Sequence, residues 1–184
     1  MPLSAASWRG GLGVLMTTMR AGVALGSNLG DRLGNLSAAR RQISALAPVQ
    51  PPILASATYE TEPVACEPGA PKFLNAVMEI GYAGEPEELL RELRAIESSL
   101  GRLAAHARNV SRTVDLDLLY FGEVQVNGAE LELPHPRVHE RRFVLEPLAE
   151  IRPDLILPAQ AAPVAELLRQ LPETVPLVRF ASEW

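Results

Sequence analysis

The chain has 184 residues, of which 47% are hydrophobic and 21% are charged, and its formal net charge is −5. These values are typical of one globular domain with an ordinary core, and they exclude a disordered or fibrous chain. A net negative charge gives no general attraction to nucleic acid or to an anionic membrane, so we expect neither partner. The single cysteine, Cys66, excludes an internal disulfide and agrees with a cytoplasmic location.

The first twenty residues differ from the rest of the chain. They hold two arginines and no acid, and three glycines interrupt their apolar stretch. A signal peptide needs a continuous apolar segment. We therefore expect residues 1–20 to be a disordered extension and residues 21–184 to form a single domain.

Strands and helices are expected to alternate after that extension. Apolar residues recur near the helical period after residues 29 and 85, whereas β-branched and aromatic residues dominate the segments between. Ser27, Asn28 and Asp31 are candidate caps of the first helix. The expected strands cover 22–26, 53–61, 73–81 and 114–120, followed by a hairpin over 122–133 with its turn at Asn127-Gly128, and the expected helices cover 29–46, 85–100, 143–150 and 164–171.

The order strand, helix, strand, strand, helix, strand indicates an α+β fold. It fits the split βαβ, ferredoxin-like arrangement, in which helices lie on one face of an antiparallel sheet.

The strongest chemical signal is Asp115-Leu116-Asp117 in the fourth strand. Because side chains alternate along a strand, the two aspartates share one face, and Val114, Leu116, Leu118 and Tyr120 form an apolar face opposite. Two carboxylates about 7 Å apart repel each other unless a cation lies between them, and oxygen ligands favour a hard ion such as Mg²⁺. The alternative is a solvent-facing strand with two acids, because a bare Asp-x-Asp is common by chance.

The surroundings of the two aspartates are basic. Residues 101–114 contain Arg102, Arg108 and Arg112 and no acid, and a second basic cluster follows over 135–142. Such cations balance the charge of bound phosphates, whereas a basic surface loop is the alternative. Zinc is disfavoured, because the histidines and the cysteine lack a familiar ligand spacing.

Two shorter motifs suggest further contacts. The turn Gly26-Ser27-Asn28-Leu29-Gly30 could cradle a phosphate at a helix N-terminus, although it lacks the spacing of a Walker A loop. Phe73 and Asn75 suit recognition of a flat, hydrogen-bonding heterocycle, or they are a strand-edge ring and an amide that satisfies the backbone.

Taken together and in this order, the motifs resemble the 6-hydroxymethyl-7,8-dihydropterin pyrophosphokinases of folate biosynthesis. The resemblance runs from about Val23 to Ile151, and its most specific segment is RTVDLDLLYFG over 112–122. The other segments are VALGSNLGD (23–31), YETEP (59–63), FLN (73–75), IE (96–97) with GR (101–102), and LPHPR (133–137) with Arg141 and Phe143.

The resemblance implies an activity, cofactors and site residues. The β,γ-pyrophosphoryl group of ATP would pass to the hydroxymethyl oxygen of the pterin, with release of AMP, and two Mg²⁺ ions would be held by Asp115 and Asp117. Arg102, Arg112 and these aspartates would form the catalytic set, and the chain would act as a monomer, with a dimer as the alternative. The implied ATP side is Glu97, Arg102, Arg112, Leu118, His135 and Arg141, and the implied pterin side is Thr61, Pro63, Val64 and Asn75 with Phe73 and Phe143 stacking on the ring, above Gly26, Ser27 and Asn28.

Three positions depart from the pattern of well-known members. Ala104 and Glu130 each stand where some members carry a basic residue, and Asn109 stands where some carry Trp. Ala104 and Asn109 lie in the loop that closes over ATP in the family.

Two other functional classes stay open. A non-catalytic effector-binding module would not need two aspartates on one face beside Arg112. A nucleotidyltransferase usually places its Gly-Ser and Asp-x-Asp motifs close together, unlike the separation seen here.

Overall fold

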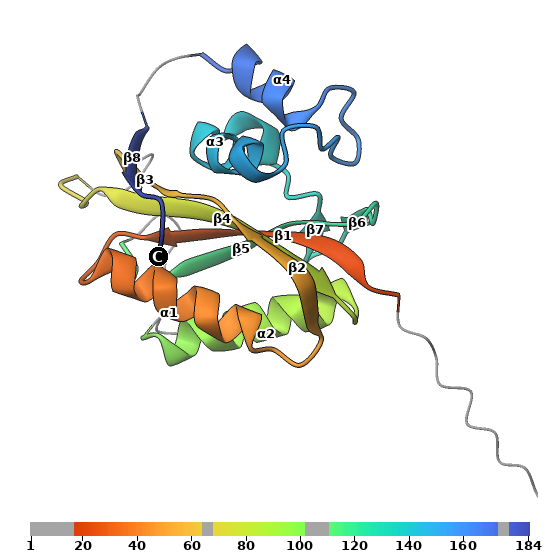
Figure 1. Cartoon of the computed structure of the whole chain (residues 1–184), viewed down its shortest axis with the longest axis horizontal. Coiled ribbons are helices and arrows are strands. Elements are labelled where there is room, and N and C mark those ends of the chain that lie inside the picture. Colours follow the sequence, from red (N-terminus) through yellow and green to blue (C-terminus); the bar gives the residue numbers. More distant parts are fainter. Residues whose placement is uncertain (1–16, 64–67, 102–110, 173–176) are drawn as a thin grey trace, which may run out of the picture.

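The computed structural model describes residues 17–63, 68–101, 111–172 and 177–184 (Figure 1). Its elements are β1 (Met19–Ser27), α1 (Arg32–Ser44), β2 (Val49–Ala55), β3 (Thr58–Thr61), β4 (Phe73–Tyr82), α2 (Pro86–Ser99), β5 (Asp115–Phe121), β6 (Val126–Asn127), β7 (Glu132–Leu133), a 3₁₀ turn (Val138–Glu140), α3 (Arg142–Ile151), α4 (Val164–Gln170) and β8 (Val178–Ala181). Among these helices, none has the length and apolar character needed to cross a membrane.

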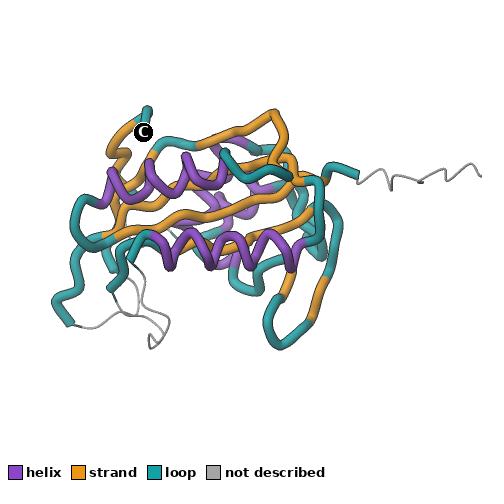
Figure 2. The backbone as a smooth tube through the Cα atoms, turned by 90° about the horizontal axis from the view of Figure 1, so that it is seen from below, coloured by secondary structure: helices purple, strands orange, loops and turns teal. Residues whose placement is uncertain are grey.

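The α+β class and the antiparallel sheet are confirmed. Within the described residues the main sheet has the order β5-β1-β4-β3-β8, and β2 also pairs with β4. Helices α1 and α2 cover one face; α3 lies against the other, and α4 packs on α3 (Figures 1 and 2). Helices on a single face were expected, and that expectation holds only for the first two. Two apolar clusters result, one beneath α1 and α2 and one beneath α3 and α4.

Helix α2 begins within one residue of its predicted start, whereas α1 begins at Arg32, three residues after the predicted start at residue 29. The Asp31 side chain caps α1 by accepting a hydrogen bond from the Gly34 amide at 3.0 Å, so it is the cap among the three candidates. At α2 the amide of Glu85 donates to Glu88 at 3.1 Å, which closes a capping box around the first turn. Leu89, Leu93 and Ile96 form the buried face of α2, as the helical period predicts.

Several strand boundaries differ from the predictions. The strand expected over 53–61 is broken at residues 56–57, where the Ser56 hydroxyl accepts a bond from Val77, so β2 and β3 are separate partners of β4. Strand β1 begins at Met19, before the expected domain start at residue 21, because it pairs with β4 from Met19↔Tyr82 onward. Strand β8 was not predicted; it pairs with β3.

A bulge in β5 corrects the predicted side of one residue. Pairing with β1 runs from Val23↔Leu118 to Gly22↔Tyr120, so Leu119 is an extra residue. Leu118 lies in the cluster under α1 and α2, whereas Tyr120 lies in the cluster on the opposite face. Gly22 makes this placement feasible, because a Cβ there would lie 2.2 Å from the Tyr120 ring.

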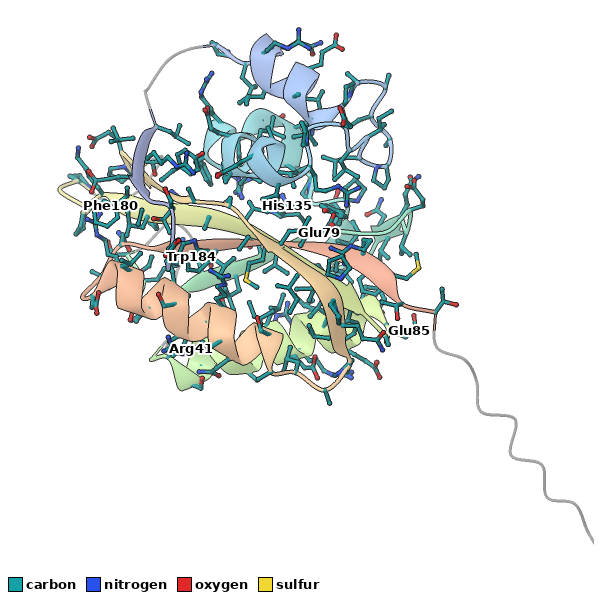
Figure 3. All side chains as sticks on the ribbon, in the orientation of Figure 1. Arg41, Glu79, Glu85, His135, Phe180 and Trp184 are labelled. Atoms are coloured by element: carbon teal, nitrogen blue, oxygen red, sulfur yellow. The ribbon has the colours of Figure 1, made fainter. Side chains whose placement is uncertain are left out.

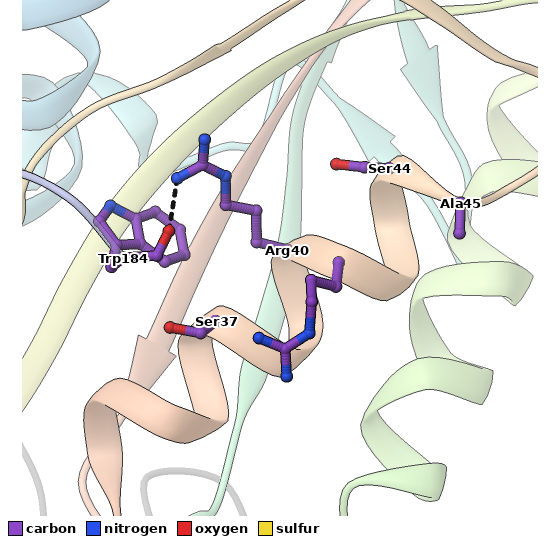
Figure 4. A pocket seen from close by; sticks show the side chains of 6 residues that line it. Ser37, Arg40, Ser44, Ala45 and Trp184 are labelled. Carbon is purple, nitrogen blue, oxygen red and sulfur yellow. Dashed lines mark hydrogen bonds between the residues drawn. The ribbon is translucent and has the colours of Figure 1, made fainter.

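The C-terminal residue Trp184 is anchored on α1 (Figure 4). Its indole donates to the Ser56 carbonyl at 2.8 Å, and the Arg40 guanidinium donates to the Trp184 carbonyl at 2.6 Å. Arg40 also lies over the indole ring, 5.1 Å from its centroid. The end of the chain is thereby held against both α1 and the β2–β3 break, beside a cavity of about 420 Å³.

Candidate active site

The candidate site is built around Gly26 in β1. This residue pairs with Asn75 of β4 on one side and with Asp115 of β5 on the other. A Cβ at Gly26 would lie 3.3 Å from Asn75 Oδ1, 3.8 Å from the Phe73 ring and 3.9 Å from Asp115 Cβ. The absence of a side chain therefore lets three predicted site residues from two other strands approach the same point.

The two aspartates share one face of the sheet, as predicted. Asp117 pairs with Ala24, two residues from Gly26, and therefore lies on the same side as Asp115. Their side chains are partly open, with 23% exposed for Asp115 and 39% for Asp117. Leu116 between them is buried in the cluster under α1 and α2.

Each aspartate faces a guanidinium group. Arg112 Nη1 lies 2.7 Å from Asp115 Oδ1, and Arg141 Nη1 lies 3.4 Å from Asp117 Oδ2. Burial lowers the pKa of Arg141 from its usual value, although Asp117 acts in the opposite direction. These pairs partly balance the two carboxylates. Within the described part of the chain, no group of three or more His, Cys, Asp or Glu side chains is placed so that it could hold a metal ion.

Polar and aromatic side chains on β3, β4 and α3 form the other half of the site. Asn75 is only 8% exposed, and its Nδ2 donates to Thr61 Oγ1 at 2.7 Å. Thr61 pairs with Phe73 in the β3–β4 ladder. Phe143 in the first turn of α3 lies under the Arg141 guanidinium, 5.6 Å from the ring centroid, which links this aromatic residue to the arginine on Asp117.

His135 lies within electrostatic reach of Asp117 and Arg141. Its amide donates to the Leu119 carbonyl at 2.8 Å, and its Nδ1 accepts from the Arg137 amide at 3.1 Å. Burial lowers the pKa of His135; Arg141 and Arg137 add to this, and Asp117 opposes it. The imidazole is therefore neutral near pH 7, with its Nδ1 occupied as an acceptor.

Two side chains that the resemblance assigns to the ATP side are buried on the face of the sheet that α1 and α2 cover. Glu97 on α2 is 6% exposed, and its Oε1 accepts a hydrogen bond from the Leu116 amide at 2.8 Å. Leu118 is buried in the cluster under α1 and α2, because it has the same parity as Leu116. Glu97 thus supports the strand between the two aspartates, and Leu118 has only its backbone to offer.

Four positions singled out in the sequence lie outside the described residues: Val64, Arg102, Ala104 and Asn109. Pro63 is described and partly buried at the end of β3, and Glu130 is exposed, 3.9 Å from Arg94.

Sequence reasoning missed Glu150 near the end of α3. Its carboxylate accepts from the Ala57 amide and the Tyr59 hydroxyl, both at 2.9 Å, and pairs with Arg179 of β8. These bonds tie α3, which carries Phe143, to β3, which carries Thr61. No local pattern marks this residue, because its partners lie about 30 and 90 residues away.

The fold and the site together indicate a class of protein. A carboxylate pair with flanking guanidinium groups suits metal-bound phosphates, and an adjacent amide and aromatic pocket suits a flat heterocycle. The arrangement is that of an α+β phosphoryl-transfer enzyme.

Comparison with known proteins identifies the family. Residues 22–153 match the family described as 7,8-dihydro-6-hydroxymethylpterin-pyrophosphokinase (HPPK), to which the chain belongs. The 2-amino-4-hydroxy-6-hydroxymethyldihydropteridine pyrophosphokinase of Synechocystis is 36% identical over 81% of this chain and 74% of its own length. The enzyme of that name from Bacillus subtilis is 44% identical over 70% of this chain and 75% of its own.

Solved structures show the same fold. An HPPK-DHPS structure from Plasmodium falciparum with SDX-DHP aligns with a TM-score of 0.66 and 14% identity, covering 86% of this chain and 45% of that chain. The present chain therefore spans less than half of that longer protein, and about a fifth of the folic acid synthesis protein fol1 of Pneumocystis carinii.

Proposed function

We propose how this chain carries out the reaction of its family. That reaction is pyrophosphoryl transfer to hydroxymethyldihydropterin in folate biosynthesis, with ATP as the co-substrate. The hydroxymethyl oxygen attacks the β-phosphorus of ATP in line and releases its proton to solvent; the bond from that phosphorus to the α,β-bridging oxygen breaks, and AMP leaves. Positioning and charge neutralisation carry most of the catalysis in such transfers.

The register Asn75–Gly26–Asp115 is the observation that carries the proposal. Neighbouring strands lie about 4.8 Å apart, so the heterocycle site on β4 and the phosphate site on β5 are separated by roughly 10 Å. A bound pterin and a bound triphosphate would then meet over Gly26. Binding both substrates side by side makes a bimolecular reaction effectively unimolecular.

We assign Mg²⁺ to the two carboxylates. The residues fit the ion, because both aspartates offer oxygen ligands on one open face, and Mg²⁺ usually takes one or two carboxylates together with substrate phosphates. Two bound ions would supply charge neutralisation along the triphosphate. Asp115 and Asp117 would hold them, and the ion pairs to Arg112 and Arg141 keep both carboxylates in place.

The remaining residues take roles in binding. Arg112 and Arg141 present planar guanidinium groups suited to phosphate oxygens, and we assign Arg102 to the same task. Neutral His135 would contact the nucleotide. The pterin would lie on Asn75, between Phe73 and Phe143, beside Thr61, Pro63 and Val64.

A product assay tests the function directly. Purified protein would be mixed with ATP, Mg²⁺ and 6-hydroxymethyl-7,8-dihydropterin, and nucleotide products would be separated by chromatography. AMP that depends on the pterin is the expected result, and an assay without pterin is the control. Formation of ADP would indicate an ordinary kinase, pyrophosphate would indicate nucleotidyl transfer, and binding without product would favour an effector-binding module.

We also propose that residues 21–184 act as one domain and as a monomer. Ala21 pairs with Ile80 of β4 and Ala181 pairs with Thr58 of β3, so both ends of this range join the same sheet. Light scattering of the purified chain at micromolar concentration should give the mass of one copy; twice that mass would indicate a dimer.

A further inference from the structure

We infer that Asn28 is a positioning residue that holds the backbone of Arg112 and joins the phosphate and pterin halves of the site. The inference rests on the function proposed above. It concerns a side chain that needs no contact with either substrate.

Asn28 brackets the peptide backbone of Arg112. Its side-chain Oδ1 accepts from the Arg112 backbone N–H at 2.7 Å, and its backbone N–H donates to the Arg112 carbonyl at 3.2 Å. Asn28 follows directly on β1 and is only 2% exposed. Both polar groups of the Arg112 backbone are thus bonded to one residue of the Gly26–Gly30 turn.

The two bonds from Asn28 hold the backbone of the residue whose guanidinium group contacts Asp115. Arg112 lies three residues before Asp115 and pairs with it at 2.7 Å, with only 19% of its side chain exposed. Residues 111–114 are not part of a helix or strand, so no regular ladder sets the position of Arg112. The bonds to Asn28 therefore supply the geometry that a strand or helix would otherwise give.

The side-chain nitrogen of Asn28 also bonds to the segment that leads into the pterin half of the site. Asn28 Nδ2 donates to Ser111 Oγ at 2.9 Å and to the Pro71 carbonyl at 3.3 Å. Pro71 lies two residues before Phe73, in the connection that leads into β4. An amide offers an acceptor to the Arg112 backbone and donors to Ser111 and Pro71 at once; a carboxylate has no donor for Pro71.

A double-mutant cycle tests whether Asn28 works through Arg112. We expect Asn28→Ala to lower kcat on the order of 10–100-fold, since a displacement near 1 Å can cost about 100-fold. In an Arg112→Ala background the same change should lower kcat by less than about 3-fold, because the group that it positions is gone. Equal factors in both backgrounds, or an unchanged kcat in the single variant, would overturn the inference.

Asn35→Ala is the matched control. Asn35 bonds to the Leu29 carbonyl at 2.9 Å and to Ser27 Oγ at 3.3 Å, so it supports the same turn without touching residues 111–112. We expect its kcat to stay within about 3-fold of the wild type. A loss as large as that of Asn28→Ala would assign the effect to general support of the turn.

Two further measurements keep the test decisive. If Asn28→Ala does not fold, Asn28→Asp keeps the acceptor for Arg112 and loses the donor to Pro71, and the Ser111 hydroxyl can donate to the new carboxylate instead of accepting from the amide. KM for pterin should then rise while kcat falls little; a fall in kcat without a change in that KM would contradict the inference. If the wild type forms no AMP, the proposed function fails, and binding of a non-hydrolysable ATP analogue with Mg²⁺ in the same variants still tests the positioning. We expect Asn28→Ala to weaken binding of the analogue in the wild-type background but not in the Arg112→Ala background. Additive losses of binding in the double variant would overturn the inference.

Discussion

Replacing Glu79 by Gln should destabilise the protein by about 2–4 kcal/mol. Glu79 in β4 is fully buried and labelled in Figure 3. Its Oε1 accepts from Arg20 Nε at 2.9 Å and from Nη2 at 2.6 Å, and Arg152 Nη1 bonds to the same oxygen at 2.6 Å. The Tyr120 hydroxyl donates to the other oxygen. One carboxylate thus joins β1, β5 and the end of α3.

The magnitude follows from the charge that the substitution leaves behind. Breaking a buried pair by removing one partner costs about 3–5 kcal/mol, because the remaining charge is uncompensated. Here the Arg20 side chain is 29% exposed and Arg152 is 34% exposed, so water screens both cations and lowers that figure. Gln keeps an acceptor for Tyr120, which lowers it further.

Urea unfolding at pH 7 measures the effect, with Glu130→Gln as the control. Glu130 is exposed and 3.9 Å from Arg94, and its replacement should change the free energy of unfolding by less than about 0.5 kcal/mol. For a chain of this length, the loss at Glu79 corresponds to a fall in Tm of roughly 5–15 °C. A loss below about 1 kcal/mol would refute the reasoning.

The pH dependence gives an independent check. Burial alone would raise the pKa of Glu79, but hydrogen bonds from Arg152, Tyr120 and Arg20 outweigh it and lower the pKa below 4.5. A carboxylate with a lowered pKa contributes stability above its unfolded pKa and loses it as the pH falls through the folded value. The difference between wild type and Glu79→Gln should therefore be constant above about pH 5.5 and shrink below about pH 4.5.

Three further predictions concern the site itself. Asp117→Ala should abolish Mg²⁺-dependent AMP formation while the far-ultraviolet circular dichroism stays unchanged, because the side chain is partly open; retained turnover would contradict the metal assignment. Phe143→Ala should weaken pterin binding by about 5–13-fold and ATP binding less, in calorimetric titrations, since a stacked ring is worth roughly 1–1.5 kcal/mol; equal losses would argue against stacking. His135→Gln should reduce the fall in Tm between pH 7 and pH 5.5, because the lowered pKa of His135 keeps it neutral while the unfolded chain takes up protons below about pH 6.5; an identical slope in both proteins would count against this.

Local patterns in the sequence were sufficient for much of the site. The period of two along β5 predicts that Asp115 and Asp117 share a face, and the structure confirms it. Helix α2 follows from its leucine spacing and its acidic first turn, and Asp31 was among the predicted caps. These features depend on neighbours within four residues, which is the range that periodicity and capping describe.

Other features depend on partners distant in the sequence. The bulge that turns Tyr120 to the opposite face, the break between β2 and β3, and the pairing of β8 all require knowledge of the neighbouring strand. The buried position of Glu97 depends on the Leu116 backbone N–H, which donates to Glu97 at the outer edge of β5. That edge has no neighbouring strand in the described sheet, where β5 pairs only with β1.

Motifs in the sequence are sufficient to indicate the chemistry of this protein: they are an ordered set, with a carboxylate pair on one face of a strand and basic segments on either side. Which of these groups meet depends on the folded sheet. Gly26 lies between Asn75 and Asp115 in the sheet, Arg141 reaches Asp117 across 24 residues, and Asn28 bonds to Arg112 across 84. Local propensities act through the backbone within a few residues, whereas these contacts form only when the sheet has brought distant strands side by side.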